Sequence, residues 1–162
     1  MRCATLVFAF AISVWPVVTV GSQAPAGHAL PEPLRAHVNE DRFEVVTSVR
    51  GLPLGVRDQL QTLFRSAVLD IAEPGAAFRA TDVIVDRNLP TRRLVMAGCS
   101  IDHCLVYYER GGIAHTWHVA LFHWMPAATR LEWGGIAPGG LKTIDDLRKA
   151  VLSGSVKASS SW

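Results

Sequence analysis

Residues 93–124 read RLVMAGCSIDHCLVYYERGGIAHTWHVALFHW, and this stretch carries the strongest structural signal in the chain. Three apolar runs, at residues 93–97, 105–108 and 113–124, are separated only by a short cysteine segment and by Gly111-Gly112. Such short connections can only join antiparallel neighbours, because parallel strands need a crossover of a dozen or more residues. The stretch therefore predicts the centre of an antiparallel sheet.

Segments on both sides of this stretch predict further strands. Residues 43–49 hold four apolar side chains in a short extended pattern that ends at Gly51-Leu52-Pro53. Residues 82–85 form a shorter apolar run, and residues 129–133 alternate polar and apolar side chains, as in a strand with one solvated face. We expect a sheet of about five or six strands.

Two segments have helical patterns. The apolar residues Val56, Leu60, Leu63 and Phe64 recur at helical spacing and predict an amphipathic helix around residues 54–66. Thr143 and Asp146 form a variant of the capping box, and Gly154 ends the short helix that follows. The predicted fold is a single α+β domain over residues 42–154, with both helices packed on one face of the antiparallel sheet.

The segments flanking this domain lack a periodic pattern. Residues 27–41 contain Pro31 and Pro33 among many polar groups, which predicts an extended arm. Residues 155–162 include three consecutive serines and predict a disordered tail.

The N-terminus has the pattern of a secretory signal peptide. Arg2 precedes the uncharged apolar run at residues 4–20, and small residues around Ala24-Pro25-Ala26 form a cleavage zone. We expect residues 1–26 to be removed and the mature chain to be periplasmic or extracellular, with no stable membrane span. A retained anchor is the alternative, although a run of 17 residues is at the short limit for crossing a bilayer.

Composition limits the function classes. The 162 residues are 49% hydrophobic and carry a formal net charge of +2. These values exclude an intrinsically disordered chain, and also a nucleic-acid binder that works through bulk basic charge. No nucleic-acid partner is expected.

Cys99 and Cys104 enclose Ser100, Ile101, Asp102 and His103 between two predicted antiparallel strands. Facing positions of a hairpin bring Cα atoms within disulfide range, and disulfides persist in exported proteins. We therefore expect a Cys99–Cys104 disulfide. Its role is either stabilisation alone or also the presentation of Ser100, Ile101, Asp102 and His103 in a fixed pose to a partner.

Two resemblances bear on function. The cysteine loop with adjacent Asp102 and His103 resembles the protruding loop of the periplasmic inhibitors of vertebrate lysozyme, which implies that these two residues enter the enzyme's active site. More broadly, Tyr108-Glu109-Arg110-Gly111-Gly112 and His115-x-x-His118-Val119, with the strings at residues 80–83, 89–90 and 92–95, resemble a family of small exported bacterial proteins of unknown function. This second likeness implies a single bacterial domain and supplies no activity.

A possible polar site consists of His115, His118 and Glu109. On a strand, positions three apart point to opposite faces, so His115 and His118 should not converge on a metal ion. Trp117 is expected in the core, whereas Trp124 and Trp133, near strand ends, could stack on a sugar or peptide. No catalytic residue, metal or cofactor is predicted.

The sequence thus favours an exported, non-catalytic binding or interaction protein. Its partner would be another protein, such as a lysozyme-like enzyme, or a cell-envelope component. The alternatives are a lysozyme-inhibitor-like protein that uses the Cys99–Cys104 loop, and an enzyme or metal protein that uses His115 and His118.

Overall fold

A computed structural model describes residues 29–83, 86–157, 159 and 162. The predicted signal peptide, residues 1–26, lies outside the described residues. Eight helices and strands follow in the order α1 (Glu32–Glu40), β1 (Glu44–Val46), α2 (Leu54–Phe64), β2 (Arg92–Cys99), β3 (His103–Arg110), β4 (Thr116–Met125), β5 (Ala128–Ala137) and α3 (Ile144–Leu152).

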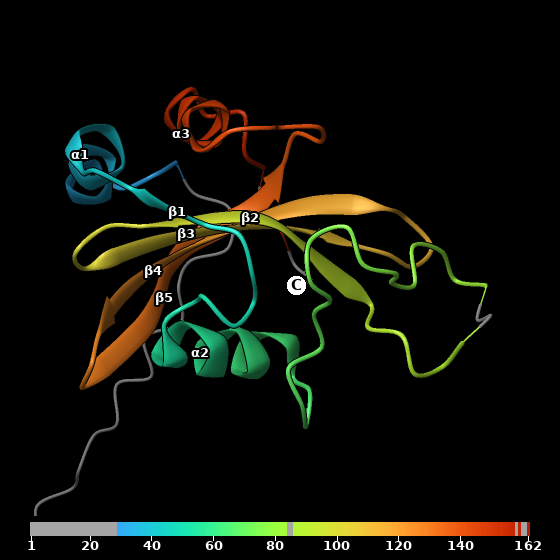
Figure 1. The fold of residues 1–162 in the computed structure, drawn as a ribbon. Coiled ribbons are helices and arrows are strands. Elements are labelled where there is room, and N and C mark those ends of the chain that lie inside the picture. Colours follow the sequence, from blue (N-terminus) through green and yellow to red (C-terminus); the bar gives the residue numbers. More distant parts are fainter. Residues whose placement is uncertain (1–28, 84–85, 158, 160–161) are drawn as a thin grey trace, which may run out of the picture.

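The five strands form one antiparallel sheet in the order β1-β2-β3-β4-β5 (Figure 1). The three apolar runs at residues 93–124 become β2, β3 and β4, joined by tight turns as their short connections require. The prediction of an α+β domain built on an antiparallel sheet of about five or six strands is confirmed.

Both faces of the sheet are apolar, since alternate residues of each central strand belong to different core clusters. On β3, Val106 and Tyr108 pack toward α2, whereas Leu105 and Tyr107 pack toward α1 and α3. Figure 1 shows the sheet lying between α2 on one side and the pair α1 and α3 on the other. We call these sides the α2 face and the α1/α3 face.

The helices therefore do not share one face, and that part of the prediction is wrong. The physical reason is the two-sided apolar pattern of β3 and β4, because each apolar face must be covered by a helix to leave water. The predicted capping box is present: the Thr143 hydroxyl accepts a hydrogen bond from the Asp146 amide, and the Asp146 carboxylate accepts one from the Thr143 amide.

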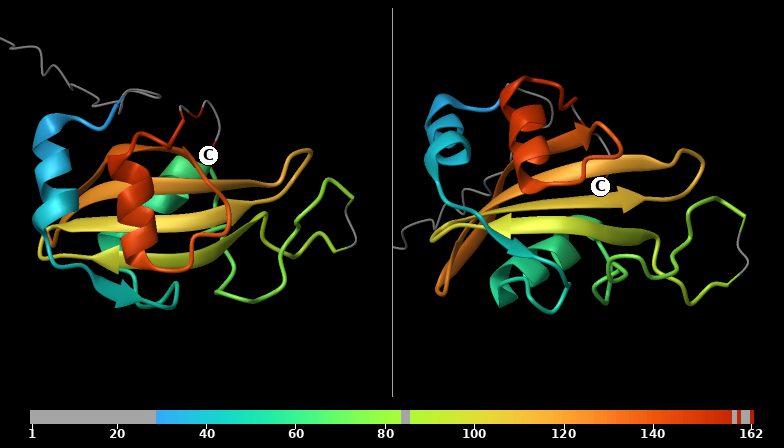
Figure 2. Two further views of the ribbon diagram at one scale, coloured as in Figure 1. Left: turned by 90° about the horizontal axis from the view of Figure 1, so that it is seen from above. Right: turned by 45° about the horizontal axis from the view of Figure 1, so that its top comes forward.

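The expected extended arm is instead largely helix α1. Its two prolines stand at the N-cap and in the first turn. The N–H groups at these positions have no acceptor within the helix, so proline's missing N–H costs no hydrogen bond there. Val38 is fully buried, and the Arg148 side chain of α3 donates hydrogen bonds to the carbonyls of Val38 and Asn39 at 2.7 and 2.6 Å. Figure 2 shows α1 and α3 side by side above the sheet.

Two smaller predictions also need correction or qualification. Of the short strand expected at residues 82–85, Asp82 and Val83 lie in a bend, and residues 84–85 are outside the described residues. The expected disordered tail is held to the domain where it is described, because Lys157 pairs with Ile136 and Ser159 is buried.

Within residues 29–83 and 86–157, together with 159 and 162, no helix has the length and apolar character needed to cross a membrane.

Candidate functional site

The expected disulfide joins Cys99 and Cys104, which are direct antiparallel partners at the end of the β2–β3 hairpin. Backbone hydrogen bonds fix the turn between them. The Ser100 amide donates to the His103 carbonyl at 2.7 Å, and the Trp124 amide donates to the Asp102 carbonyl at 2.7 Å. The turn is therefore tied both to itself and to the neighbouring strand β4.

The turn residues do not all project outward. Ile101 is 88% exposed and Asp102 is half-buried, but Ser100 is buried and His103 is only 3% exposed. The expectation that His103 protrudes toward a partner is therefore wrong. His103 starts β3 with its side chain on the same face as Leu105, and α1 covers it there.

His37 on α1 and Asp41 at the C-cap of that helix meet Asp102 and His103 of the turn, and we call these four residues the hairpin-end cluster. The imidazole rings of His37 and His103 stack with centroids 4.1 Å apart. His103 Nδ1 lies 2.8 Å from Asp102 Oδ1 and 3.8 Å from Asp41 Oδ2, and His37 Nδ1 lies 3.3 Å from the same Asp41 oxygen. One potential ligand atom from each residue lies within 4.8 Å of all the others.

Polar side chains surround this cluster. The Ser100 hydroxyl donates a hydrogen bond to Asp41 Oδ2 at 3.1 Å. On β5, Glu132 Oε2 faces His103 Nε2 at 3.4 Å, while Glu132 Oε1 accepts a hydrogen bond from Arg130. Glu132 Oε2 is buried and accepts no hydrogen bond from the described residues.

The pKa of Asp102 lies below its ordinary value. Burial acts to raise it, but the hydrogen bond with His103 and the nearby histidines His37 and His123 together outweigh burial. Asp102 is therefore ionised at neutral pH and is available as an anionic ligand or hydrogen-bond acceptor.

The predicted polar site at the other end of the same strand is brought together only in part. Glu109 lies between Arg93, whose Nε is 2.6 Å from Oε1, and His115, whose Nε2 is 2.7 Å from Oε2. We call these three residues the far-end cluster. Arg93 also stacks over Phe78, with 4.5 Å to the ring centroid, so the guanidinium is held on two sides.

His118 does not join the far-end cluster, because it lies on the α2 face and stacks on Tyr108. Burial first, and then the positive charges of Arg110 and Arg92, lower the pKa of His118 to about 4. His115 and His118 therefore do not converge, as their spacing predicted. The three tryptophans are not an open platform: Trp133 is buried, Trp117 packs against the core of the α1/α3 face, and Trp124 against that of the α2 face.

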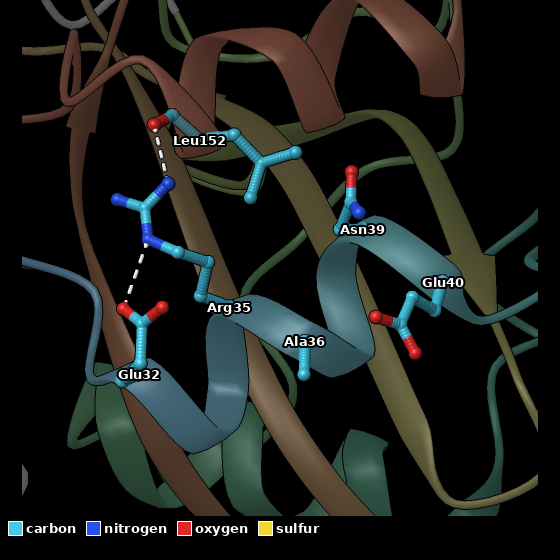
Figure 3. Close-up of a pocket in the computed structure, with 6 residues that line it drawn as sticks. All are labelled: Glu32, Arg35, Ala36, Asn39, Glu40 and Leu152. Atoms are coloured by element: carbon cyan, nitrogen blue, oxygen red, sulfur yellow. Dashed lines mark hydrogen bonds and ion pairs between the residues drawn. The ribbon is translucent and has the colours of Figure 1, made fainter.

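A groove of about 410 Å³ runs between α1 and α3. Figure 3 shows Arg35 in this groove, with its guanidinium between the Glu32 carboxylate at 3.4 Å and the Leu152 carbonyl at 2.9 Å. The Arg35 guanidinium is thus already paired within the chain, so the groove is a weaker candidate for a binding site than the hairpin-end cluster.

Sequence reasoning missed His37, Asp41 and Glu132. His37 and Asp41 are four positions apart, a spacing that brings two side chains together along a helix, but the prolines before them suggested an extended arm. Glu132 could be recognised only as a polar residue of an alternating strand.

Comparisons of the chain with protein-family models, curated proteins and solved structures found no match.

Proposed function

We propose that this chain is an exported, non-catalytic binding protein and that it binds through the hairpin end, meaning the β2–β3 turn together with the hairpin-end cluster. One observation carries the proposal: side chains from α1 and from the turn converge where a disulfide ties the backbone. Groups ordered before a ligand arrives lose less conformational entropy on binding.

Export is supported by the signal-like N-terminus and by the disulfide, because disulfides persist in oxidising compartments. A periplasmic or extracellular protein meets other exported proteins and components of the cell envelope. These are the partner classes that fit the proposed location.

Lysozyme inhibition is a second candidate, favoured by the strongly exposed Ile101 at the tip of the turn. A protruding apolar side chain beside the carboxylate of Asp102 suits insertion into an enzyme cleft. His103 faces inward, so the inhibitor-like contacts would come from Ile101 and Asp102 rather than from His103.

An enzyme based on His115 and His118 is less well supported. These histidines lie on opposite faces of the sheet, and the carboxylate of Glu109 is already bound by Arg93 and His115. With both carboxylate oxygens occupied by side chains of the same protein, Glu109 is not free to contact a substrate.

Nuclear magnetic resonance of the ¹⁵N-labelled chain tests the proposal, with hen-type lysozyme and soluble cell-wall fragments as probes. We expect amide shifts at the hairpin end. If lysozyme is the partner, Ile101→Ser should weaken its binding at least tenfold. Ile113→Ser is the matched control, since Ile113 is equally exposed at the β3–β4 turn. Shifts confined to the far-end cluster, or turnover of the fragments, would contradict the proposal, and no shift with either probe would exclude these two partners.

A further inference from the structure

We propose that the hairpin-end cluster binds a divalent transition-metal ion of the zinc class, with His37, Asp41, Asp102 and His103 as its ligands. The inference names a ligand for the binding element proposed above and rests on that proposal. It is carried by distances, by charge balance and by one buried oxygen that lacks a hydrogen-bond donor.

The distances within the cluster are close to those of a four-coordinate site. Zinc bonds to nitrogen and oxygen of about 2.0–2.2 Å in a tetrahedron place neighbouring ligand atoms about 3.3–3.6 Å apart. The observed separations of 2.8, 3.3 and 3.8 Å among His103, Asp102, Asp41 and His37 bracket this value. All four ligand atoms lie within 4.8 Å of one another, so side-chain adjustments of about an ångström would bring the ligands onto one ion.

The charge balance of the region favours a cation. Three carboxylates, those of Asp41, Asp102 and Glu132, lie around His103. Among the residues that the structure describes, Arg130 is the only arginine or lysine within 4 Å of any of them, and it pairs with Glu132. When the histidines are neutral, as metal ligands must be, the three carboxylates and Arg130 carry a net charge of −2, which one divalent ion would neutralise.

Glu132 Oε2 provides an observation independent of the cluster itself. This oxygen is buried, accepts no hydrogen bond and faces His103 Nε2 at 3.4 Å. A metal ion on His103 Nδ1 would place the ring proton on Nε2, where it could be donated to Glu132. Metal-bound histidines commonly donate their second ring nitrogen to a carboxylate in this way. Metal binding would thus turn this 3.4 Å contact into a hydrogen bond.

The donor types select the class of ion. Two imidazoles and two carboxylates suit zinc and its neighbours in the first transition series, whereas calcium and magnesium prefer oxygen ligands alone. Thiolate ligands are not involved, because Cys99 and Cys104 form a disulfide. Four protein ligands fill a tetrahedral shell and leave no open position for a substrate, which agrees with binding rather than catalysis.

The ligands from α1 are held in place before any ion arrives. His37 and Asp41 lie one helical turn apart, and Arg148 fixes the end of that helix through the carbonyls of Val38 and Asn39. Solvent reaches the site past His37, whose side chain is 43% exposed. The site is therefore both preorganised and accessible to an ion.

Metal titration of the untagged, disulfide-bonded chain, stripped with a chelator, tests the inference. Calorimetry with Zn²⁺ should give one ion per chain with a micromolar or lower Kd, and Co²⁺ should show the visible bands of a tetrahedral site. His37→Gln and Asp41→Asn should each raise the Kd at least tenfold, and Glu132→Gln should raise it by about 10–100-fold through the second ring nitrogen of His103.

His115→Gln is the matched control, because it alters a carboxylate-bound histidine at the far end of the sheet. Circular dichroism shows whether each variant is folded, and the side chain of His37 is 43% exposed, so its substitution leaves the buried core unchanged. No Zn²⁺ or Co²⁺ binding by the folded chain would overturn the inference, as would equal effects of His37→Gln and His115→Gln. Hairpin-end shifts with lysozyme or cell-wall fragments, without metal binding, would overturn the metal site and leave the proposed function in place.

Discussion

The two ends of the sheet each hold carboxylate groups on the α1/α3 face, one at the far end and three at the hairpin end, about 20 Å apart along β3, but the charges of these groups are balanced differently. At the far end, Glu109 lies between the Arg93 guanidinium and the His115 imidazole, so its charge is compensated within the chain. At the hairpin end, among the residues that the structure describes, the only arginine or lysine within 4 Å of the three carboxylates is Arg130, which pairs with Glu132 alone. A compensated ion pair needs no ligand, whereas an under-compensated cluster points to one.

The turns at the two ends differ as well. The β2–β3 turn is closed by a disulfide and by backbone hydrogen bonds to β4. The β3–β4 turn relies on glycines: a Cβ at Gly111 would lie 1.7 Å from the Arg79 carbonyl oxygen, and Gly112 has a φ of +128°. The far end is thus a closely packed turn beside a carboxylate whose charge is compensated by Arg93. The hairpin end is a disulfide-linked turn beside a cluster with more carboxylates than arginines.

The largest effect is expected at the far end on the α2 face, where His118 is buried as the neutral imidazole. Its pKa is about 4 in the folded chain and near 6.5 in the unfolded chain, so only the unfolded chain takes up a proton between these values. The stabilisation from neutral His118 is complete above pH 6.5 and is lost as pH falls toward 4, by about 3 kcal/mol. Urea denaturation at pH 7.5 and pH 4.5 measures this loss.

His118→Phe keeps a ring against Tyr108 and removes the titrating group. We expect this variant to lose less unfolding free energy than the parent between pH 7.5 and pH 4.5, by about 3 kcal/mol. Equal losses in the two proteins would show that other groups govern the acid sensitivity.

A smaller effect is expected from Glu109→Gln at the far end. The substitution leaves the partly buried Arg93 without its counter-charge, which costs about 2 kcal/mol; this is less than for a fully buried pair because the Arg93 side chain is 28% exposed. Thermal and urea unfolding at pH 7.5 measure the change. A loss of unfolding free energy smaller than the error of the measurement would show that the Glu109–Arg93 pair does not stabilise the far end.

The smallest effect is expected from Asp102→Asn at the hairpin end, measured without metal. The amide oxygen can still accept the hydrogen bond from His103, and the attraction of Asp102 to the histidines, which lowers its pKa, involves a partly exposed carboxylate and contributes little. The unfolding free energy at pH 7.5 should change by less than about 0.5 kcal/mol. A loss as large as that of Glu109→Gln would mean that the hairpin end is a closed structural ion pair like the far end.

The features predicted correctly depend on neighbours in the chain. The hairpins follow from short connections, the disulfide from facing positions of one hairpin, and the divergence of His115 and His118 from their spacing on a strand. Helix α1 was missed because Pro31 and Pro33 disfavour a helix interior, although both are compatible with a helix start.

The hairpin-end cluster joins residues that are distant in the sequence. The positions of His37 and Asp41 depend on α1 packing beside α3, and that of Glu132 on the pairing of β5 with β4. The inward direction of His103 follows from the register of β3, in which a shift of one residue would turn the side chain to the other face.

Periodicity, connection length and cysteine spacing are local properties, and they sufficed for the α+β class, the antiparallel sheet and its disulfide. The assignment of helices to both faces, the burial of His103 and the meeting of α1 with the hairpin end arose from long-range packing. Burial of apolar surface drives that packing without being directional, so a single sequence does not show which faces will meet. The contrast between a closed and an unbalanced charge cluster therefore becomes visible only in the folded chain.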